Sequence, residues 1–346
     1  MKVIVDDKIP YIREAIARVA DEVVYLPGSA ITSADVRDAD ALIVRTRTRC
    51  NRQLLEGSRV QFIATATIGF DHLDTDYLRE AGVRWTNCPG CNASSVAQYL
   101  HTSLLLLQQE RGLSLCHSTL GVVGVGHVGT LVAEVGRRLG MRVLLCDPPR
   151  AERGEQGFLP LEVLMREADV LTFHTPLVRE GHYPTFHMAG EDFFHALARK
   201  PIIINTSRGE VVDGGALLSA LDEGRVSEAI IDVWEHEPDI DLRLLERAYL
   251  GTPHIAGYSA DGKANATRMA LEALCAHFSL PHEDFGITPP PPPVGVNPAD
   301  PLSYYDPRRD SQALKSSPGQ FESLRGNYPL RREQDFDEGC ERKSAK

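Results

Sequence analysis

Three short segments in the second half of the chain carry side chains suited to moving a proton and holding an anion. They are residues 205–209, 232–238 and 252–258. Each follows an apolar stretch, and together they supply Arg208, Glu237 and His254. A carboxylate beside a histidine can orient the imidazole for proton exchange near neutral pH, and a guanidinium can hold a carboxylate through two hydrogen bonds. Taken singly, each residue could instead be a loop or ion-pair residue. The combination predicts acid/base chemistry on an anionic substrate.

A glycine-rich turn earlier in the chain has the spacing of a dinucleotide-binding loop. A β-branched stretch at residues 119–123 runs into Gly124, Gly126 and Gly129, and a helical pattern follows. The first glycine permits a tight turn, the second lets the backbone approach a pyrophosphate, and the third lets the helix pack on the strand. Asp147, at the end of the next apolar stretch, can accept hydrogen bonds from ribose hydroxyls. This pattern predicts NAD as cofactor.

Two arginines leave the preference between NAD and NADP open. Asp147 would repel a 2′-phosphate, but Arg150 and Arg153 follow it closely, and either could accept that phosphate. NAD is the favoured interpretation.

A basic cluster near the start of the chain indicates a substrate with more than one anionic group. Arg45, Arg47 and Arg49 follow an apolar stretch at residues 41–44, in a chain with 37 basic and 48 acidic residues. The loop around Thr67 offers hydroxyls and backbone donors. For Arg47 and Arg49, a solvated basic turn is the alternative interpretation.

The composition excludes several classes of protein. A net charge of −11 argues against a general nucleic-acid or anionic-membrane binder. No stretch approaches the roughly 20 apolar residues that span a bilayer, and the first residues do not resemble a signal peptide. Seven cysteines, an odd number, fit reduced thiols better than a disulfide framework. We therefore expect a cytoplasmic protein whose partners include no nucleic acid and no membrane.

Short β-branched stretches alternate with helical ones, which predicts parallel sheets of the α/β class. The predicted strands are residues 2–6, 23–26, 41–44, 62–65, 83–86, 119–123, 142–146, 170–173, 202–205 and 228–232. The main predicted helices are residues 10–19, 94–109 and 264–279.

This order predicts a Rossmann-type doubly wound domain inserted into a flavodoxin-like α/β substrate domain, followed by a short C-terminal segment. The substrate-binding domain would comprise residues 1–92 and 258–286, and the NAD-binding domain residues 93–257. Residues 287–346 include a run of five prolines at 289–293 and would form a linker and a reduced dimerisation-type segment. Composition alone leaves open whether the part after the linker is a small docking segment or mostly disordered.

In combination these motifs are similar to those of the D-isomer-specific 2-hydroxyacid dehydrogenases. The resemblance rests on the glycine loop with Asp147 and on the segments around Arg208, Glu237 and His254. It covers about residues 1 to 280 and resumes weakly at residues 305–333, which are similar to part of a C-terminal dimerisation domain in one branch of the family. Further matches to that branch are residues 64–67, 69–72, 89–92, 146–150, 172–176 and 256–258.

The resemblance implies NAD-dependent oxidation of 4-phospho-D-erythronate to 2-oxo-3-hydroxy-4-phosphobutanoate by hydride transfer, a step towards pyridoxal 5′-phosphate. Arg208 would hold the substrate carboxylate, His254 would take the proton of the C2 hydroxyl, and Glu237 would tune His254. The partner would be a small phosphorylated hydroxyacid, and the protein would be a homodimer.

The resemblance also implies positions that contact the cofactor and the substrate. The cofactor positions are Gly124, Gly126, His127, Val128, Gly129, Asp147, Thr175, Asp232 and Gly257. The substrate positions are Thr46, Thr67 and Tyr258, to which we add Arg45 as a neighbouring cation. No metal site is expected, because no second cysteine pair completes a zinc site with Cys88 and Cys91.

Two other functions remain open from the residues alone. A dehydrogenase of the same family acting on phosphoglycerate or hydroxypyruvate would share the fold and the catalytic set, and only the loops around Arg45 and Thr67 would differ. An NAD-binding, co-repressor-like interaction module would bind the cofactor without turning over small hydroxyacids.

Overall fold

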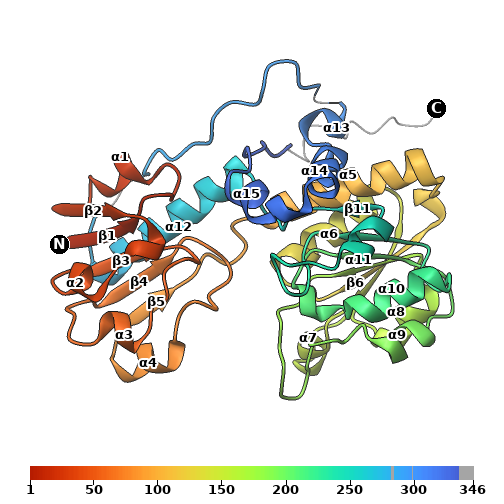
Figure 1. The fold of residues 1–346 in the computed structure, drawn as a ribbon, viewed down its shortest axis with the longest axis horizontal. Helices are drawn as coiled ribbons and strands as arrows, with labels where there is room; N and C mark the ends of the chain where they lie inside the picture. Colours follow the sequence, from red (N-terminus) through yellow and green to blue (C-terminus); the bar gives the residue numbers. More distant parts are fainter. Residues whose placement is uncertain (282–283, 298, 335–346) are drawn as a thin grey trace. The chain divides into compact units, whose positions relative to one another are not determined.

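The computed structural model describes residues 1–281, 284–297 and 299–334 (Figure 1). The chain divides into two compact units. Unit 1 comprises Met1–Asn92 and Ser259–Pro291, and unit 2 comprises Ala93–Tyr258 and the chain from Pro292 onward. Among the described residues, no helix is both long and apolar enough to cross a membrane.

Unit 1 contains a five-stranded parallel sheet in the order β2-β1-β3-β4-β5. This is the flavodoxin-like order, and it confirms the predicted fold class. The strands are β1 (Lys2–Asp6), β2 (Glu22–Leu26), β3 (Ala41–Val44), β4 (Phe62–Thr65) and β5 (Arg84–Thr86). The helices are α1 (Ile12–Ile16), α2 (Ser33–Val36), α3 (Arg52–Leu55), α4 (Thr75–Glu80) and α12 (Ala260–Phe278).

Helices cover both faces of this sheet because alternate strand residues point to opposite sides. Val3 and Val5 of β1 pack in the cluster that contains α1 and α12, whereas Ile4 packs with α2, α3 and α4. Helix α12 therefore belongs to unit 1, although in the sequence it comes after the main part of unit 2, Ala93–Tyr258 (Figure 1).

Unit 2 contains a six-stranded parallel sheet in the order β11-β10-β9-β8-β6-β7. The strands are β6 (Thr119–Val123), β7 (Arg142–Cys146), β8 (Val170–Phe173), β9 (Ile202–Asn205), β10 (Glu228–Ile231) and β11 (Leu250–Gly251). The helices before the C-terminal segment are α5 (Ala93–Arg111), α6 (His127–Arg138), α7 (Pro148–Glu152), α8 (Leu161–Glu167), α9 (Glu191–His195), α10 (Gly214–Asp222) and α11 (Leu242–Arg247). The strand order reverses between β6 and β8, the place where doubly wound sheets bind ligands.

The C-terminal segment forms helices that pack within unit 2 (blue in Figure 1). They are α13 (Pro301–Tyr304), α14 (Pro307–Ser316) and α15 (Phe321–Gly326). Leu314 and Phe321 are buried in the hydrophobic cluster that also contains residues of α10 and α11. The Ser311 hydroxyl accepts a hydrogen bond from the amide of Gly251 at 3.1 Å. This bond covers part of the edge strand β11, which would otherwise expose unpaired backbone groups.

The predicted helix over residues 10–19 is wrong in its extent. Helix α1 spans only Ile12–Ile16, because Tyr11 before it lies in the left-handed region with φ 62° and the chain after it continues in turns. The predicted strand positions are confirmed to within one residue at either end.

Phe321→Ala tests how firmly the C-terminal segment is held. The side chain is 1% exposed, so its removal should lower the free energy of unfolding of unit 2 by about 3–5 kcal/mol. The two tryptophans lie in different units, so urea unfolding followed by Trp234 fluorescence in a Trp85→Phe background reports on unit 2. Leu242→Ala, at a 57% exposed side chain of the same unit, is the control and should cost less than about 1 kcal/mol. Equal costs would contradict the packing of α15.

Candidate active site

The glycine loop after β6 leaves space for a phosphate at the start of α6. Gly124 has φ 85°, and a Cβ there would lie 2.8 Å from the carbonyl group of His174. A Cβ on Gly129 would lie 2.0 Å from the Gly124 oxygen, so helix and loop pack as closely as only glycines allow. A Cβ on Gly126 would meet open space. The exposed backbone there can donate hydrogen bonds to an anion at the positive end of the helix.

The other two residues of the predicted loop begin α6. His127 is exposed, and Val128 is half-buried against the core between α5 and α6. The backbone amides of this first helical turn have no partners within the helix, and they are the groups that a phosphate would engage.

Asp147 holds the glycine loop from the end of β7. Its Oδ2 accepts a hydrogen bond from the Val125 amide at 2.8 Å, and its Oδ1 accepts one from the Arg150 amide at 3.1 Å. The guanidinium of Arg150 pairs with Glu155 at 2.6 Å, and Arg153 pairs with the same carboxylate at 3.1 Å. Both arginines that could accept a 2′-phosphate are therefore already engaged.

A buried hydroxyl beside the loop fits a bound dinucleotide. The Thr175 methyl group lies where a Cβ on Gly124 would meet it, at 2.8 Å, which makes the two residues neighbours. The Thr175 hydroxyl oxygen is buried and has no hydrogen-bond partner within the described structure. Because unpaired buried polar atoms are costly, this hydroxyl is suited to contact a cofactor.

His254 and Glu237 form the only strong acid/base pair among the predicted site residues. Nδ1 of His254 lies 2.8 Å from Oε2 and 3.1 Å from Oε1 of Glu237. The Glu237 carboxylate also accepts a hydrogen bond from the Trp234 amide at 2.9 Å, and the Trp234 indole donates to the Thr252 carbonyl at 2.9 Å. Trp234 thus ties together the two loops that carry the pair.

The carboxylate of Glu237 is held in its charged form. Burial alone would raise its pKa, but the hydrogen bond and charge of His254, the Trp234 amide and the nearby Arg325 together hold the pKa below its ordinary value. A charged carboxylate at Nδ1 fixes the imidazole orientation and stabilises the imidazolium that forms when Nε2 accepts a proton.

Asp232 holds the backbone that follows His254. Its carboxylate accepts hydrogen bonds from the amides of Ile255 at 2.8 Å and Ala256 at 2.9 Å, and from the Thr252 hydroxyl at 2.6 Å. Burial raises the pKa of Asp232 although these groups favour its charged form. Gly257 lies within the loop positioned in this way.

A buried arginine from the C-terminal segment holds the carbonyl side of the same loop. Arg331 is 8% exposed and donates to the carbonyl oxygens of Ile255 at 3.1 Å, Ala256 at 2.6 Å and Tyr258 at 2.9 Å. Its remaining hydrogen bonds go mainly to Ser95 and Gln98 of α5. Arg331 could not be predicted from the sequence, because nothing in a charged, proline-rich tail marks one arginine as buried.

Arg208 presents a cation at the end of β9. Its guanidinium donates a hydrogen bond to the Ser207 carbonyl at 2.8 Å, and within the described ranges no carboxylate pairs with it. The Asn205 side chain donates to the Arg208 carbonyl at 2.9 Å and so supports the turn. Because β9 and β10 are neighbours, Arg208 and the loop that carries Glu237 emerge at the same sheet edge.

The predicted substrate residues of unit 1 follow two neighbouring strands. Arg45 and Thr46 come directly after β3, and Thr67 follows β4. The guanidinium of Arg45 pairs with the fully buried Asp6, at 3.2 Å from Nε to Oδ2, while Thr46 is exposed. The Thr67 hydroxyl donates to the Gly69 carbonyl at 2.9 Å. Arg45 is thus fixed in place, but much of its charge is countered by Asp6.

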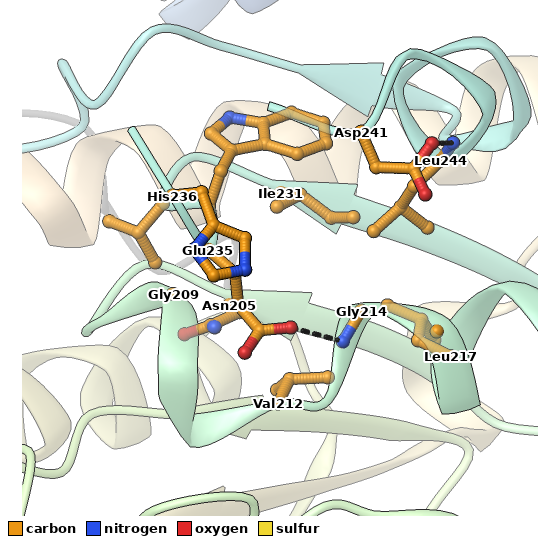
Figure 2. Close-up of a pocket in the computed structure, with 13 residues that line it drawn as sticks. Asn205, Gly209, Val212, Gly214, Leu217, Ile231, Glu235, His236, Asp241 and Leu244 are labelled. Atoms are coloured by element: carbon orange, nitrogen blue, oxygen red, sulfur yellow. Dashed lines mark hydrogen bonds between the residues drawn. The ribbon is translucent and has the colours of Figure 1, made fainter. Parts of the chain in front are cut away.

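A cavity of about 220 Å³ lies within unit 2, lined by residues of the segments that follow β9 and β10 (Figure 2). None of the predicted site residues lines it. Figure 2 shows the Glu235 carboxylate accepting a hydrogen bond from the amide of Gly214, at 2.9 Å, and Glu235 also lies 2.7 Å from Nε2 of His187. A side chain of the protein therefore already occupies the start of α10 beside the cavity.

No metal centre is evident in the described part of the chain, where no group of three or more His, Cys, Asp and Glu side chains could hold an ion. Cys88 and Cys91 are buried, and neither is joined in a disulfide. The Cys88 thiol lies 3.2 Å from the Ala266 carbonyl, and burial raises its pKa to about 12. This suits a structural cysteine.

Comparison with known proteins gives consistent matches. Residues 96–256 match the family model described as D-isomer specific 2-hydroxyacid dehydrogenase, NAD binding domain. The chain is 61% identical to erythronate-4-phosphate dehydrogenase of Bacteroides fragilis over 96% of this chain and 97% of that protein. It is 45% identical to the protein of the same name from Cronobacter sakazakii, over 96% of this chain and 92% of that one.

A solved structure shares the fold. D-lactate dehydrogenase from Aquifex aeolicus, complexed with NAD and lactic acid, is 26% identical, with a TM-score of 0.66 over 81% of this chain and 96% of that chain. With the glycine loop and the unpartnered Thr175 hydroxyl, these matches show that residues 96–256 form an NAD-binding domain.

Glu155→Gln tests whether the paired arginines set the cofactor preference. The wild-type protein should bind NAD more tightly than NADP, because Asp147 repels a 2′-phosphate and Glu155 engages both arginines. Releasing them should tighten NADP binding about fivefold and leave NAD binding nearly unchanged. Isothermal titration of both cofactors measures this. Glu134→Gln, which breaks an exposed pair with Arg138 on α6, is the control. Similar NADP affinities in the two variants would contradict the assignment.

Proposed function

The chain belongs to the family of D-isomer-specific 2-hydroxyacid dehydrogenases, and we propose that its substrate is 4-phospho-D-erythronate. The reaction would be NAD-dependent oxidation at C2 to give 2-oxo-3-hydroxy-4-phosphobutanoate, a step towards pyridoxal 5′-phosphate. The observation that carries this choice of substrate is the 61% identity to an erythronate-4-phosphate dehydrogenase along almost the whole of both chains.

We assign the proton transfer to His254. With Nδ1 held by Glu237, Nε2 is the nitrogen left to take the proton of the C2 hydroxyl. Glu237 would stabilise the imidazolium and fix the ring, and Arg208 would hold the substrate carboxylate and polarise the oxygen on C2. NAD, when bound, accepts the hydride that leaves C2.

We assign cofactor binding to the glycine loop and to the strand ends beside it. The amides of residues 124–129 would hold the pyrophosphate, Asp147 the adenosine ribose, and Thr175 would satisfy its hydroxyl on the cofactor. Asp232 and Gly257 would contribute at the nicotinamide end.

We assign the anionic groups of the substrate to unit 1 and to Tyr258. Arg45, Thr46 and Thr67 follow β3 and β4, where backbone and hydroxyl donors gather at the carboxyl ends of parallel strands. The Asp6 pair fixes Arg45 but leaves it with further N–H groups to donate.

The domain roles, assembly and location are parts of the same proposal. Residues 1–92 and 258–286 would bind the substrate, residues 93–257 the cofactor, and residues 287–346 would include a dimerisation-type segment of a homodimer. A cytoplasmic location is supported by the six cysteines of the described residues that are not joined in disulfides.

The substrate is tested by measuring NADH formation from NAD with each of three compounds in turn: 4-phospho-D-erythronate, D-3-phosphoglycerate and D-erythronate. A reagent that traps the carbonyl product is included in every assay. We expect efficient turnover of 4-phospho-D-erythronate alone. A preference for phosphoglycerate would keep the fold and cofactor but overturn the substrate. NAD binding without any turnover would favour an interaction module instead.

His254→Asn tests the assigned base. Asparagine tolerates the left-handed backbone of His254, φ 57°, so the variant should fold. Loss of the base should lower kcat by about 10²–10⁴-fold and leave the Kd for NAD unchanged. His236→Asn is the matched control, since His236 directly precedes Glu237, is exposed and has φ 61°, so asparagine should be tolerated there as well. A wild-type kcat for His254→Asn would remove His254 from this role.

A further inference from the structure

Helix α15 of the C-terminal segment brings an arginine to the acid/base pair. Nη1 of Arg325 lies 3.5 Å from Oε2 of Glu237, the same oxygen that lies 2.8 Å from Nδ1 of His254. The Arg325 side chain is 24% exposed and the Glu237 side chain 17% exposed. One carboxylate oxygen is therefore shared between a permanent cation and a titratable imidazole.

The position of Arg325 is fixed by its neighbours in the segment. Phe321, at the start of α15, is 1% exposed and packs in the core of unit 2. Beyond the helix, Arg331 makes its hydrogen bonds to the loop after His254, and its guanidinium stacks on the Tyr305 ring at 4.0 Å. Arg325 lies between these two anchors, so its approach to Glu237 is imposed by packing.

We propose that Arg325 is a positioning residue of the active site, delivered by the anchored C-terminal segment, which shares the Glu237 carboxylate with His254 and so keeps the imidazole ready to accept a proton. The proposal rests on the roles proposed above for His254 and Glu237. Arg325 would contact no reacting atom and would act through Glu237.

The charges of Glu237 and Arg325 act in opposite directions on the protonation of the His254 imidazole. A buried carboxylate facing a histidine alone favours the imidazolium, which cannot act as a base. Arg325 offsets part of that negative charge and repels the imidazolium. Burial disfavours the guanidinium charge, but Tyr258, Glu237 and Glu322 raise the pKa of Arg325 and keep it charged.

Asp232 is a further charged group near His254 and Glu237, and the substitutions tested below leave it unchanged. Asp232, which directly follows β10, faces His254 and is held by the loop amides independently of α15. Tyr258 and Glu322 face Arg325 from the loop and from α15 itself. Replacing Arg325 alone therefore removes one positive charge and leaves these groups in place.

The first test is the pH profile of kcat/KM for oxidation in Arg325→Met, Arg325→Lys and wild type. In Arg325→Met the acid limb should move to higher pH by about one unit, with the alkaline plateau kept within about twofold. Arg325→Lys, which retains the charge, should stay close to wild type. Arg309→Met removes an exposed arginine from α14 of the same segment and is the control. An unmoved acid limb, or an equal fall of kcat/KM at every pH, would overturn the proposal.

The second test needs no turnover and no bound cofactor. The His254 ring can be followed by NMR in the full-length protein labelled at histidine Cε1, with its signal among the 12 histidines assigned through His254→Asn. Its titration midpoint should rise in Arg325→Met and not in Arg309→Met, and an unchanged midpoint in folded Arg325→Met would contradict the shared carboxylate. Failure of wild-type turnover with 4-phospho-D-erythronate would defeat the proposed substrate, whereas this titration would still decide the role of Arg325.

Discussion

The loop from His254 to Tyr258 is held between two buried and opposite charges, and the geometry of the candidate active site depends on this loop. Asp232 accepts hydrogen bonds from the amides of the loop, and Arg331 donates to its carbonyls. A buried charge without partners is costly, so each is stable only while the loop keeps this conformation. The constraint sets His254 against Glu237 at 2.8 Å.

The parallel sheets explain why the remaining groups gather where they do. Strands of one direction end at one edge, so the glycine loop, Arg208 and the Glu237 loop all emerge at the carboxyl edge of the unit 2 sheet. The strands themselves are buried on both faces by helices, which makes them rigid supports. Arg45 and Thr67 follow the same rule in unit 1. The chemistry therefore resides in turns, and the sheets fix the places of those turns.

Sequence reasoning located what depends on local pattern and missed what depends on distant packing. Strands and the glycine loop follow from residue type and short spacing, and the structure confirms their positions. The helix predicted at residues 10–19 is shorter because a single left-handed residue, Tyr11, delays its start. Asp232 was predicted only as a cofactor residue, yet it also holds the loop that follows His254. Arg325 and Arg331 could not be identified, since their roles exist only once the tail packs in unit 2.

The central claim is that a hydride passes from C2 of 4-phospho-D-erythronate to NAD at the site built around His254 and Arg208. Its most direct test uses substrate deuterated at C2 and mass spectrometry of the reduced cofactor. We expect one deuterium in each molecule of reduced nicotinamide formed. Reduced cofactor that carries no deuterium would contradict it.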